Sequence, residues 1–234
     1  MKVIVTGASK GIGRGIATVL ARAGFQVGVL ARSRELLDEL QAEIEAANGV
    51  CHSAVCDLRD PRVTEQAIGA LREQLGGLDG LINNAGLVVR KSAFDLSMEE
   101  WQALIDTNIH GLFYATRAVL PGMREQRRGH IINLSSISGK MPLPGGSAYA
   151  ATKFAVTGFS LSLAQEVREY GIKVTVLYPG SVDSQSHRSA ANADVSWKLA
   201  PEELGQACAD ILRTAPGTLI SEFEIRPLRR PPKG

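Results

Sequence analysis

The sequence predicts one α/β domain, a doubly wound and mostly parallel sheet with helices on both faces. Short apolar runs rich in β-branched residues alternate with segments of helical periodicity, and a glycine-rich turn follows the first of these runs. Parallel strands must be joined by crossovers long enough to hold a helix, and this alternation supplies them. The length of 234 residues suits one large domain, and no repeat or linker divides residues 1–234.

The first half of the chain contributes four predicted strands, at residues 3–5, 26–30, 50–55 and 78–82. After the glycine-rich turn, apolar residues from Ile12 to Leu20 recur at helical spacing and predict the first helix. A second helix is predicted over residues 34–47, because four apolar side chains share one face: Leu36, Leu37, Leu40 and Ile44. A third is predicted over residues 61–75, where Pro61 suits the first helical turn.

The second half continues the alternation. Helices are expected over residues 98–123 and 148–170, and strands over residues 130–134, 174–177 and 218–225. Residues 181–199 are polar and irregular, and they lie beyond the C-terminal end of a strand, where open α/β sheets bind ligands. We expect this segment to form a substrate lid, with an ordinary surface loop as the alternative. Residues 227–234 are basic and rich in proline, and we expect a solvated tail there.

Composition and charge exclude several classes of protein. Apolar residues make up 44% and charged residues 21% of the chain, which argues against disordered and coiled-coil proteins. The net charge is +2, and no basic cluster is interleaved with aromatic residues, so we expect no nucleic-acid partner. No run approaches the roughly 18 to 20 consecutive apolar residues of a membrane span, and we expect no membrane partner.

The N-terminal residues and the cysteines bear on location and chemistry. The first predicted strand begins at Val3 and leaves no room for a signal peptide, so a cytoplasmic protein is expected. Cys51, Cys56 and Cys208 are odd in number and lack metal-ligand spacing. We interpret them as reduced structural thiols and predict no metal site.

The turn after the first strand has glycines spaced as G-x-x-x-G-x-G. Gly7 permits a tight turn, Gly11 lets the backbone approach a pyrophosphate, and Gly13 lets the helix pack on the strand. The N–H groups and the dipole of that helix would then face an anion. A glycine-rich turn can also be only a tight connection, so the prediction of a dinucleotide site depends on its context.

The end of the second predicted strand indicates which dinucleotide binds. Where an NAD site carries an acidic residue for the ribose hydroxyls, this chain has Ala31 and Arg32. Arg32 can bind a 2′-phosphate, and Lys10 can approach it from the glycine-rich turn. The predicted cofactor is therefore NADP(H), and the alternative is that both cations are exposed charges without a role.

Tyr149 and Lys153 stand four residues apart in a predicted helix, so both side chains emerge on one face. A tyrosine pKa near 10 is too high for proton exchange at neutral pH, and a neighbouring ammonium lowers it by favouring the phenolate. Ser136 precedes Tyr149 by thirteen residues at the end of a predicted strand. Its hydroxyl could hold a substrate oxygen beside the phenol.

With these motifs in this order, the whole chain resembles the short-chain dehydrogenase/reductase family, which has a Rossmann-type fold. The glycine-rich turn resembles the family's cofactor loop, and Asp57 resembles its adenine-contacting acid. The segment from Asn83 to Gly86 resembles the motif after the fourth strand. Pro179, Gly180, Ser181 and Val182 resemble the turn that meets the nicotinamide, and Ser184 replaces the usual threonine while keeping the hydroxyl. The resemblance implies these cofactor contacts: Gly7, Ser9, Lys10, Gly11, Ile12, Gly13, Arg32, Asp57, Asn84, Ala85, Gly86, Tyr149, Lys153, Pro179, Gly180, Val182 and Ser184.

The same resemblance implies a catalytic tetrad of Asn108, Ser136, Tyr149 and Lys153. Tyr149 would be the general acid in reduction and the base in oxidation. Lys153 would lower the tyrosine pKa and hold the nicotinamide ribose, while Ser136 would orient the carbonyl. Asn108 would anchor a proton-relay water through a bend in its helix. The asparagines could instead satisfy buried backbone groups, and for Asn83 we favour that role.

The predicted function is that of an NADP(H)-dependent oxidoreductase transferring hydride between the nicotinamide and a carbonyl or secondary alcohol. Residues 116–123, 129–133 and 222–227 resemble the branch of NADP-dependent 3-hydroxy acid dehydrogenases. A cation should then meet the substrate carboxylate, because leaving a carboxylate unpaired there is unfavourable. Arg188 in the predicted lid is the first candidate and Arg90 the second, and either could be an exposed charge without a role.

Two other functions remain open. A 3-oxoacyl-carrier-protein reductase could use Arg124, Arg127 and Arg128 to dock an acidic carrier, although Tyr170 and the basic C-terminal tail depart from such reductases. A catalytically silent cofactor-sensing regulator is less favoured, because such proteins usually lose the tyrosine or the lysine. From the family's habit of pairing long helices across a two-fold axis, we expect a homotetramer, with a dimer next.

Overall fold

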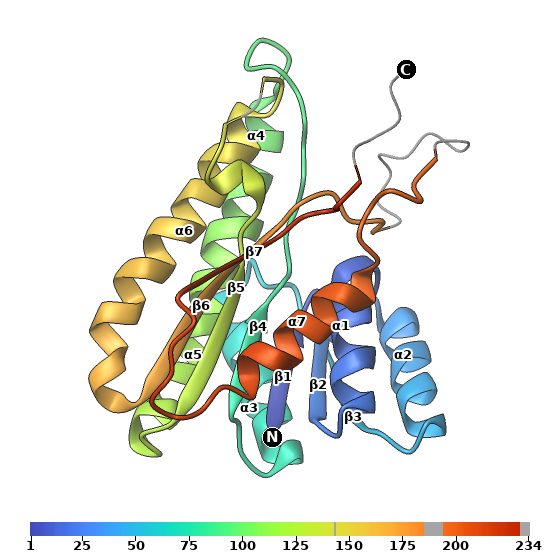
Figure 1. The fold of residues 1–234 in the computed structure, drawn as a ribbon, viewed down its shortest axis with the longest axis vertical. Helices are drawn as coiled ribbons and strands as arrows, with labels where there is room; N and C mark the ends of the chain where they lie inside the picture. The colour runs from blue at the N-terminus through green and yellow to red at the C-terminus, as the bar shows by residue number, and fades with distance from the viewer. Residues whose placement is uncertain (143, 185–193, 230–234) are drawn as a thin grey trace.

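The fold is a seven-stranded parallel sheet between two layers of helices (Figure 1). The computed structural model describes residues 1–142, 144–184 and 194–229. Along the sheet the strand order is β3-β2-β1-β4-β5-β6-β7, and each neighbouring pair is parallel. The prediction of a doubly wound α/β fold is confirmed.

The strands are β1 (Lys2–Thr6), β2 (Gln26–Ala31), β3 (Val50–Val55), β4 (Gly80–Asn83), β5 (Gly129–Leu134), β6 (Ile172–Pro179) and β7 (Glu222–Ile225). The α-helices are α1 (Gly11–Arg22), α2 (Arg34–Ala46), α3 (Pro61–Leu75), α4 (Met98–Ile105), α5 (Gly111–Glu125), α6 (Ser147–Val167) and α7 (Pro201–Leu212). A π-helical turn joins α4 to α5, and short 3₁₀ turns follow β5 and α6.

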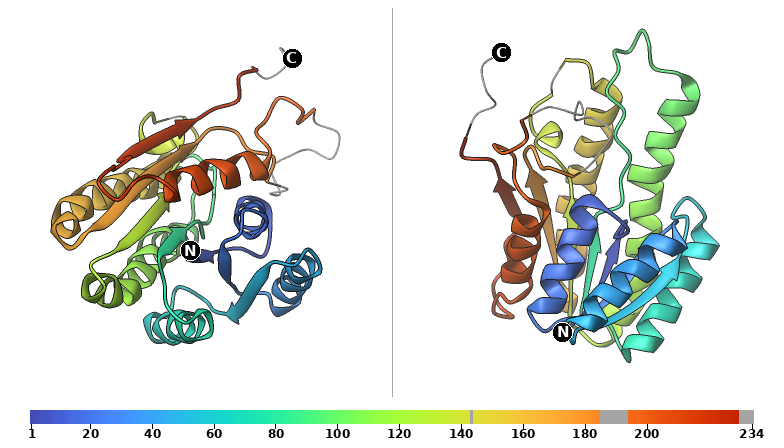
Figure 2. Two further views of the ribbon diagram at one scale, coloured as in Figure 1. Left: turned by 60° about the horizontal axis from the view of Figure 1, so that its bottom comes forward. Right: turned by 90° about the vertical axis from the view of Figure 1, so that its right-hand side faces the viewer.

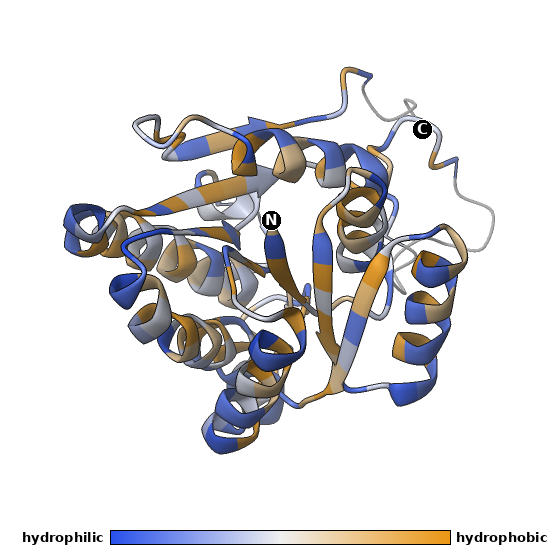
Figure 3. Ribbon diagram, turned by 90° about the horizontal axis from the view of Figure 1, so that it is seen from below, coloured by the Kyte–Doolittle hydropathy of each residue, from blue (hydrophilic) through white to orange (hydrophobic). Residues whose placement is uncertain are grey.

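Helices cover both faces of the sheet (Figure 2). Alternating side chains of the strands bury one core on each face. Val3 and Val5 of β1 pack with α1, α2 and α7, whereas Ile4 packs with α3, α5 and α6 on the other side. The strands are apolar in the middle of the molecule, while polar residues gather on the outward sides of the helices (Figure 3). Both faces of the sheet are thereby covered, as a parallel sheet requires.

The ends of the helices follow local sequence signals. Asp60 caps α3 by accepting hydrogen bonds from the backbone of Arg62 and Val63, and Pro61 occupies the first turn as predicted. The same helix ends at Gly76, whose φ of +67° suits glycine. Ser97 and Glu100 form a reciprocal capping box at the start of α4.

The structure differs from the sequence-based prediction in three elements. Helix α7 was not predicted. The helix expected over residues 98–123 is divided into α4, a π-helical turn and α5, and the last strand begins at Glu222, four residues later than expected. In the described part of the chain, no helix is long and apolar enough to cross a membrane.

The predicted lid and tail lie only partly within the described residues. The lid begins and ends side by side, because Val182 forms a parallel bridge with Leu199. Residues 185–193 fall outside the described part of the chain. Of the predicted tail, Leu228 and Arg229 are exposed.

Strand order reverses next to β1, which lies between β2 and β4. In open α/β sheets, ligands bind at such a switch point, outside the carboxyl ends of the strands. At its carboxyl end, each of the first six strands is followed by a residue predicted for the site: Gly7, Arg32, Asp57, Asn84, Ser136 and Gly180. The topology therefore brings the predicted site residues to a common edge of the sheet.

Candidate active site

The glycine-rich loop after β1 packs closely on two neighbouring segments. Gly7 and Gly11 have φ angles of +66° and +55°, which side chains other than glycine rarely adopt. A Cβ atom at Gly7 would lie 2.7 Å from the Cα of Ala85, and one at Gly11 would lie 2.7 Å from the carbonyl oxygen of Ser184. A Cβ at Gly13 would meet the carbonyl oxygen of Gly7. The three predicted glycines are therefore needed for the shape of the loop.

Asn84 joins the glycine-rich loop to the segment after β4. Its Nδ2 donates to the carbonyl oxygens of Thr6 (2.9 Å) and Gly7 (3.1 Å). In return, the Thr6 hydroxyl oxygen accepts hydrogen bonds from the backbone N–H groups of Asn84 and Ala85, each at 3.1 Å. The sequence analysis gave Thr6 no contact of its own, although it precedes the first glycine of the motif.

The N-terminus of α1 is suited to an anion. Lys10 stands at the N-cap with an extended backbone, and no side chain caps the first turn. The first turn also contains no acidic residue. Its N–H groups thus keep a positive potential at the glycine-rich loop, which is the chemistry that a pyrophosphate group requires. Loop shape and helix polarity together fit a dinucleotide.

After β3, Asp57 is paired with Arg59 and is influenced by the charge of Arg32. Arg59 binds its carboxylate in a fork, with Nε 3.0 Å from each oxygen and Nη2 2.5 Å from Oδ2. This pairing, with a smaller contribution from the charge of Arg32, holds the pKa of Asp57 below its usual value. Arg32 is exposed at the end of β2. The sequence analysis missed Arg59, and its position two residues after Asp57 was the available signal.

Lys153 is buried beside Tyr149 on α6. Its Nζ donates to the carbonyl oxygen of Leu134 at 2.8 Å and lies 5.9 Å from the centroid of the Tyr149 ring. Burial lowers the pKa of Lys153 from 10.5 to about 8. Tyr149 is 8% exposed. The helix thus holds an ammonium and a phenol together in a setting largely screened from water.

Asn108 lies in the π-helical turn Asp106–His110, where the resemblance implied a bend. Its Oδ1 accepts from the N–H of Leu87 at 2.7 Å, and its Nδ2 donates to the carbonyl of Leu87 at 2.9 Å and to the Thr152 hydroxyl at 3.0 Å. A Cβ atom at Gly86 would lie 3.4 Å from Asn108 Oδ1 and 3.7 Å from Lys153 Nζ. The absence of a side chain at Gly86 leaves room between these groups.

Ser136 begins the short turn after β5. Its Oγ accepts a hydrogen bond from the N–H of Ser138 at 3.1 Å. Ser138 in turn lines a pocket beside Tyr149, together with Arg90, Pro144, Gly145, Gly146 and Ala150. The pocket therefore has Arg90 at its wall. Arg188, the other predicted substrate cation, lies outside the described residues.

The turn after β6 contacts the C-terminal segment. Gly180 donates its N–H to the carbonyl of Ile225 at 2.8 Å, and a Cβ atom at Gly180 would lie 3.0 Å from the Cδ of Pro227. Val182 packs against the core around α1 and α7. The end of β7 therefore supports the turn that the resemblance assigns to the cofactor.

Asn83 belongs to a buried polar network behind the site. Its Nδ2 donates to the hydroxyl of Thr116 at 3.0 Å and to Oδ1 of Asn133 at 2.8 Å. Asn133 Nδ2 then donates to the hydroxyl of Ser160 at 2.8 Å. These contacts tie the ends of β4 and β5 to the helices behind them, which agrees with the structural role favoured for Asn83.

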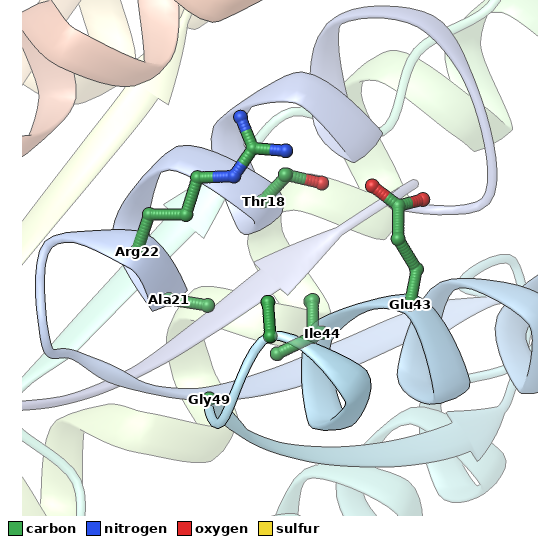
Figure 4. Close-up of a pocket in the computed structure, with 7 residues that line it drawn as sticks. Thr18, Ala21, Arg22, Glu43, Ile44 and Gly49 are labelled. Carbon is green, nitrogen blue, oxygen red and sulfur yellow. The ribbon is translucent and has the colours of Figure 1, made fainter.

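A second cavity lies between α1 and α2 (Figure 4). Arg22 of α1 and Glu43, Ile44 and Gly49 of α2 and the segment after it are among the residues that line it. None of the residues predicted for the site lines this cavity. The three cysteines are buried, and burial raises the pKa values of Cys51 and Cys208 to about 12.

Comparisons with known proteins identify the family of this chain. Residues 1–194 match the model of the short chain dehydrogenase family, so the chain belongs to that family. An uncharacterized oxidoreductase of Staphylococcus saprophyticus is 33% identical over 230 residues, covering 96% of each chain.

Two solved structures of serine dehydrogenase are similar over nearly the whole chain. A closed form complexed with NADP⁺ has a TM-score of 0.88 and 33% identity, covering 100% of this chain and 98% of that one. The enzyme from Escherichia coli has a TM-score of 0.85 and 36% identity, covering 97% and 98%. The predictions of the family, of an oxidoreductase acting on alcohol or carbonyl groups, and of NADP(H) as cofactor are confirmed at the level of the family.

Proposed function

We propose that the protein is an NADP(H)-dependent oxidoreductase that interconverts a carbonyl compound and a secondary alcohol. The observation that carries this proposal is the buried ammonium of Lys153 beside the phenol of Tyr149, at the wall of a pocket. When bound, the nicotinamide supplies or accepts the hydride. The chain's own residues bind the substrate oxygen, orient it and move its proton.

Tyr149 is the proton donor in reduction and the acceptor in oxidation. The charge of Lys153 favours the phenolate form of Tyr149, because the two groups share a site with little water and a low effective dielectric. Ser136 holds the substrate oxygen beside the phenol through its hydroxyl. Asn108 holds the π-helical turn against α6 through its hydrogen bond to Thr152, and against the segment after β4 through two hydrogen bonds with Leu87.

The cofactor site extends along the carboxyl edge of the sheet. The pyrophosphate binds at the glycine-rich loop and the N-terminus of α1, and the adenosine lies beside Asp57. Arg32 and Lys10 bind the 2′-phosphate, because both are exposed cations at this end of the site and no acidic residue follows β2 to repel that group. Lys153 and the turn at Gly180 would hold the nicotinamide half of the cofactor.

The substrate is a small 3-hydroxy or 3-oxo acid. Arg90 supports this, because it is exposed and borders the same small pocket as Tyr149, so that its guanidinium can pair with a carboxylate bound next to that pocket. The two serine dehydrogenases, whose named substrate is a 3-hydroxy acid, are among the similar structures. Arg188 is proposed as a second cation for the carboxylate, on sequence grounds alone.

The positions of Arg124, Arg127 and Arg128 give no support to carrier-protein docking. They lie just before β5, whereas Ser136 follows the opposite end of that strand. Each is already engaged: Arg124 stacks on the ring of Tyr170, Arg127 donates to the carbonyl of Glu169, and Arg128 pairs with Asp79. A small-molecule substrate is therefore preferred to a carrier-bound one. A silent regulator is less favoured, because Tyr149 and Lys153 are both present.

The protein is proposed to act in the cytoplasm as a homotetramer, with a dimer as the alternative. The outer faces of α5 and α6 carry three exposed apolar side chains: Phe113, Phe154 and Leu161. Such residues on adjacent helices suit a two-fold contact between copies of the chain.

A substrate screen tests the proposed function. Oxidation of NADPH and of NADH is followed with 3-oxo acids, acyl thioesters and neutral ketones. We expect the highest kcat/KM with NADPH and a 3-oxo acid. Turnover confined to acyl thioesters would support the carrier-protein reductase instead, and no turnover with any substrate would support the regulator.

A further inference from the structure

Thr152 lies on α6 between Tyr149 and Lys153 and is fully buried. Its hydroxyl donates to the carbonyl oxygen of Tyr149 at 2.8 Å and accepts a hydrogen bond from Nδ2 of Asn108 at 3.0 Å. The first bond is local, three residues back along the helix. The second joins residues 44 positions apart in the sequence and comes from the π-helical turn.

The two bonds need a hydroxyl group. Asn108 Nδ2 has two hydrogens, of which one goes to the carbonyl of Leu87 and the other to Thr152. The Thr152 oxygen accepts that hydrogen while its own hydrogen goes to Tyr149. An apolar side chain of the same shape would fill the space but leave a buried amide hydrogen without an acceptor. Leaving a buried donor unsatisfied costs about 1 to 3 kcal/mol.

We propose that Thr152 is a positioning residue, which fixes the Tyr149 turn of α6 relative to the π-helical turn through its hydroxyl. This inference rests on the proposed function, since it concerns the placement of the proposed proton donor. Asn108 also holds Leu87 directly after Gly86, so the same set of bonds joins the segment after β4 to α6. Loss of the hydroxyl would free Asn108 to turn away and let the two helical segments shift.

The test compares Thr152→Val, which keeps the shape, with Thr152→Ser, which keeps the hydroxyl. Thr175→Val is the matched control. Thr175 is also fully buried, donates to a backbone carbonyl at 2.6 Å (Ile220) and contacts a buried side-chain nitrogen at 2.9 Å (His130). Both valine variants thus lose a comparable pair of bonds, one set on α6 and the other on β6.

Three quantities are measured for each variant: kcat and KM for ketone reduction, the pH profile of alcohol oxidation, and amide hydrogen exchange of residues 106–110. In Thr152→Val we expect kcat to fall about ten-fold, which corresponds to about 1.4 kcal/mol, with little change in KM. The pH profile of alcohol oxidation should shift from that of the wild type, and amide hydrogen exchange in the π-helical turn should become faster. Thr152→Ser should restore all three, and Thr175→Val should leave all three unchanged.

The outcomes separate this inference from the proposed function. Wild-type kcat, pH profile and exchange in Thr152→Val would overturn the positioning role. Equal losses in Thr175→Val would show a general effect of reduced stability and would also overturn it. If the wild-type chain turns over no substrate, the proposed function fails, and the exchange of residues 106–110 still decides whether Thr152 holds the π-helical turn.

Discussion

Replacing Lys153 by methionine should stabilise the folded protein at neutral pH while removing its activity. Burial lowers the pKa of Lys153 from 10.5 to about 8, which corresponds to about 3 kcal/mol of unfavourable free energy for the buried ammonium at pH 7. Methionine has a similar length and no charge. The methionine variant loses the hydrogen bond to the Leu134 carbonyl, and this loss offsets about 1 to 2 kcal/mol of the stabilisation gained by removing the buried charge. The free energy of unfolding of Lys153→Met at pH 7 should therefore be about 1 to 2 kcal/mol higher than that of the wild type.

The pH dependence gives a second readout of the same effect. Between pH 8 and 10.5 the unfolded state keeps the lysine proton that the folded state has released. The free energy of unfolding of the wild type therefore rises with pH across this window, and its penalty disappears above it. Lys153→Met should lack this rise, so its advantage of about 1 to 2 kcal/mol at pH 7 should vanish near about pH 9 and be reversed by pH 10.5, where only the lost hydrogen bond remains.

Urea unfolding followed by tryptophan fluorescence at several pH values measures both quantities. Lys91→Met is the control, because Lys91 is 46% exposed and pairs with Glu100 at the surface. That variant should change stability by less than about 1 kcal/mol at every pH. A Lys153→Met protein that is less stable than the wild type at pH 7, with the same pH dependence, would refute the assigned desolvation of Lys153.

Four further predictions follow from the site. Arg32→Ala should weaken NADP binding roughly ten- to hundred-fold and leave NAD binding almost unchanged, and equal affinities of the wild type for both cofactors would contradict this assignment. Arg90→Ala should lower kcat/KM for an anionic substrate about ten-fold and leave kcat/KM for a neutral ketone unchanged. Arg188→Ala should have the same effect. Equal losses for the anionic and the neutral substrate would argue against carboxylate recognition. Gly11→Ala should impair NADPH binding measured by fluorescence, because its Cβ would meet the Ser184 carbonyl, and normal binding would contradict the assigned tightness. Light scattering at micromolar concentration should give about four times 25.0 kDa, and a monomer mass would contradict the proposed assembly.

The sequence was sufficient to predict the fold because its signals are local. Apolar β-branched runs placed the strands, and glycine spacing placed the loop at Gly7 and Gly11. Helix α7 also had a local signal, since Pro201 stands in its first turn and Leu204, Cys208 and Ile211 follow at helical spacing. That segment was passed over because it follows directly on the irregular residues of the predicted lid.

The remaining features depend on contacts between distant residues. The π-helical turn has no local signature, and Asn108 holds it through bonds to Leu87 and Thr152, residues that lie 21 and 44 positions away. The close approach of α1 to α7 likewise depends on two glycines far apart: a Cβ atom at Gly15 would lie 2.5 Å from Pro201, and one at Gly205 would lie 2.7 Å from Val19. A single sequence offers no way to pair such positions.

Helix α6 shows the limit of periodicity in the site itself. The helix has apolar and small residues on all of its faces, so its sequence does not form a simple amphipathic pattern. Such a pattern would not predict that Phe154 and Leu161 are exposed. The spacing of Tyr149 and Lys153 still predicted a shared face. It did not predict that Lys153 would be held by the carbonyl at the end of β5, because that contact depends on the packing of the helix on the sheet.

The turnover of Tyr149→Phe tests the central claim most directly. NADPH oxidation is measured with the best ketone substrate for the wild type and the variant, together with NADPH affinity by fluorescence. Because phenylalanine keeps the ring and removes the only proposed proton donor, the account predicts unchanged NADPH affinity and the loss of nearly all turnover. Retention of most of the wild-type kcat with intact NADPH binding would contradict the account.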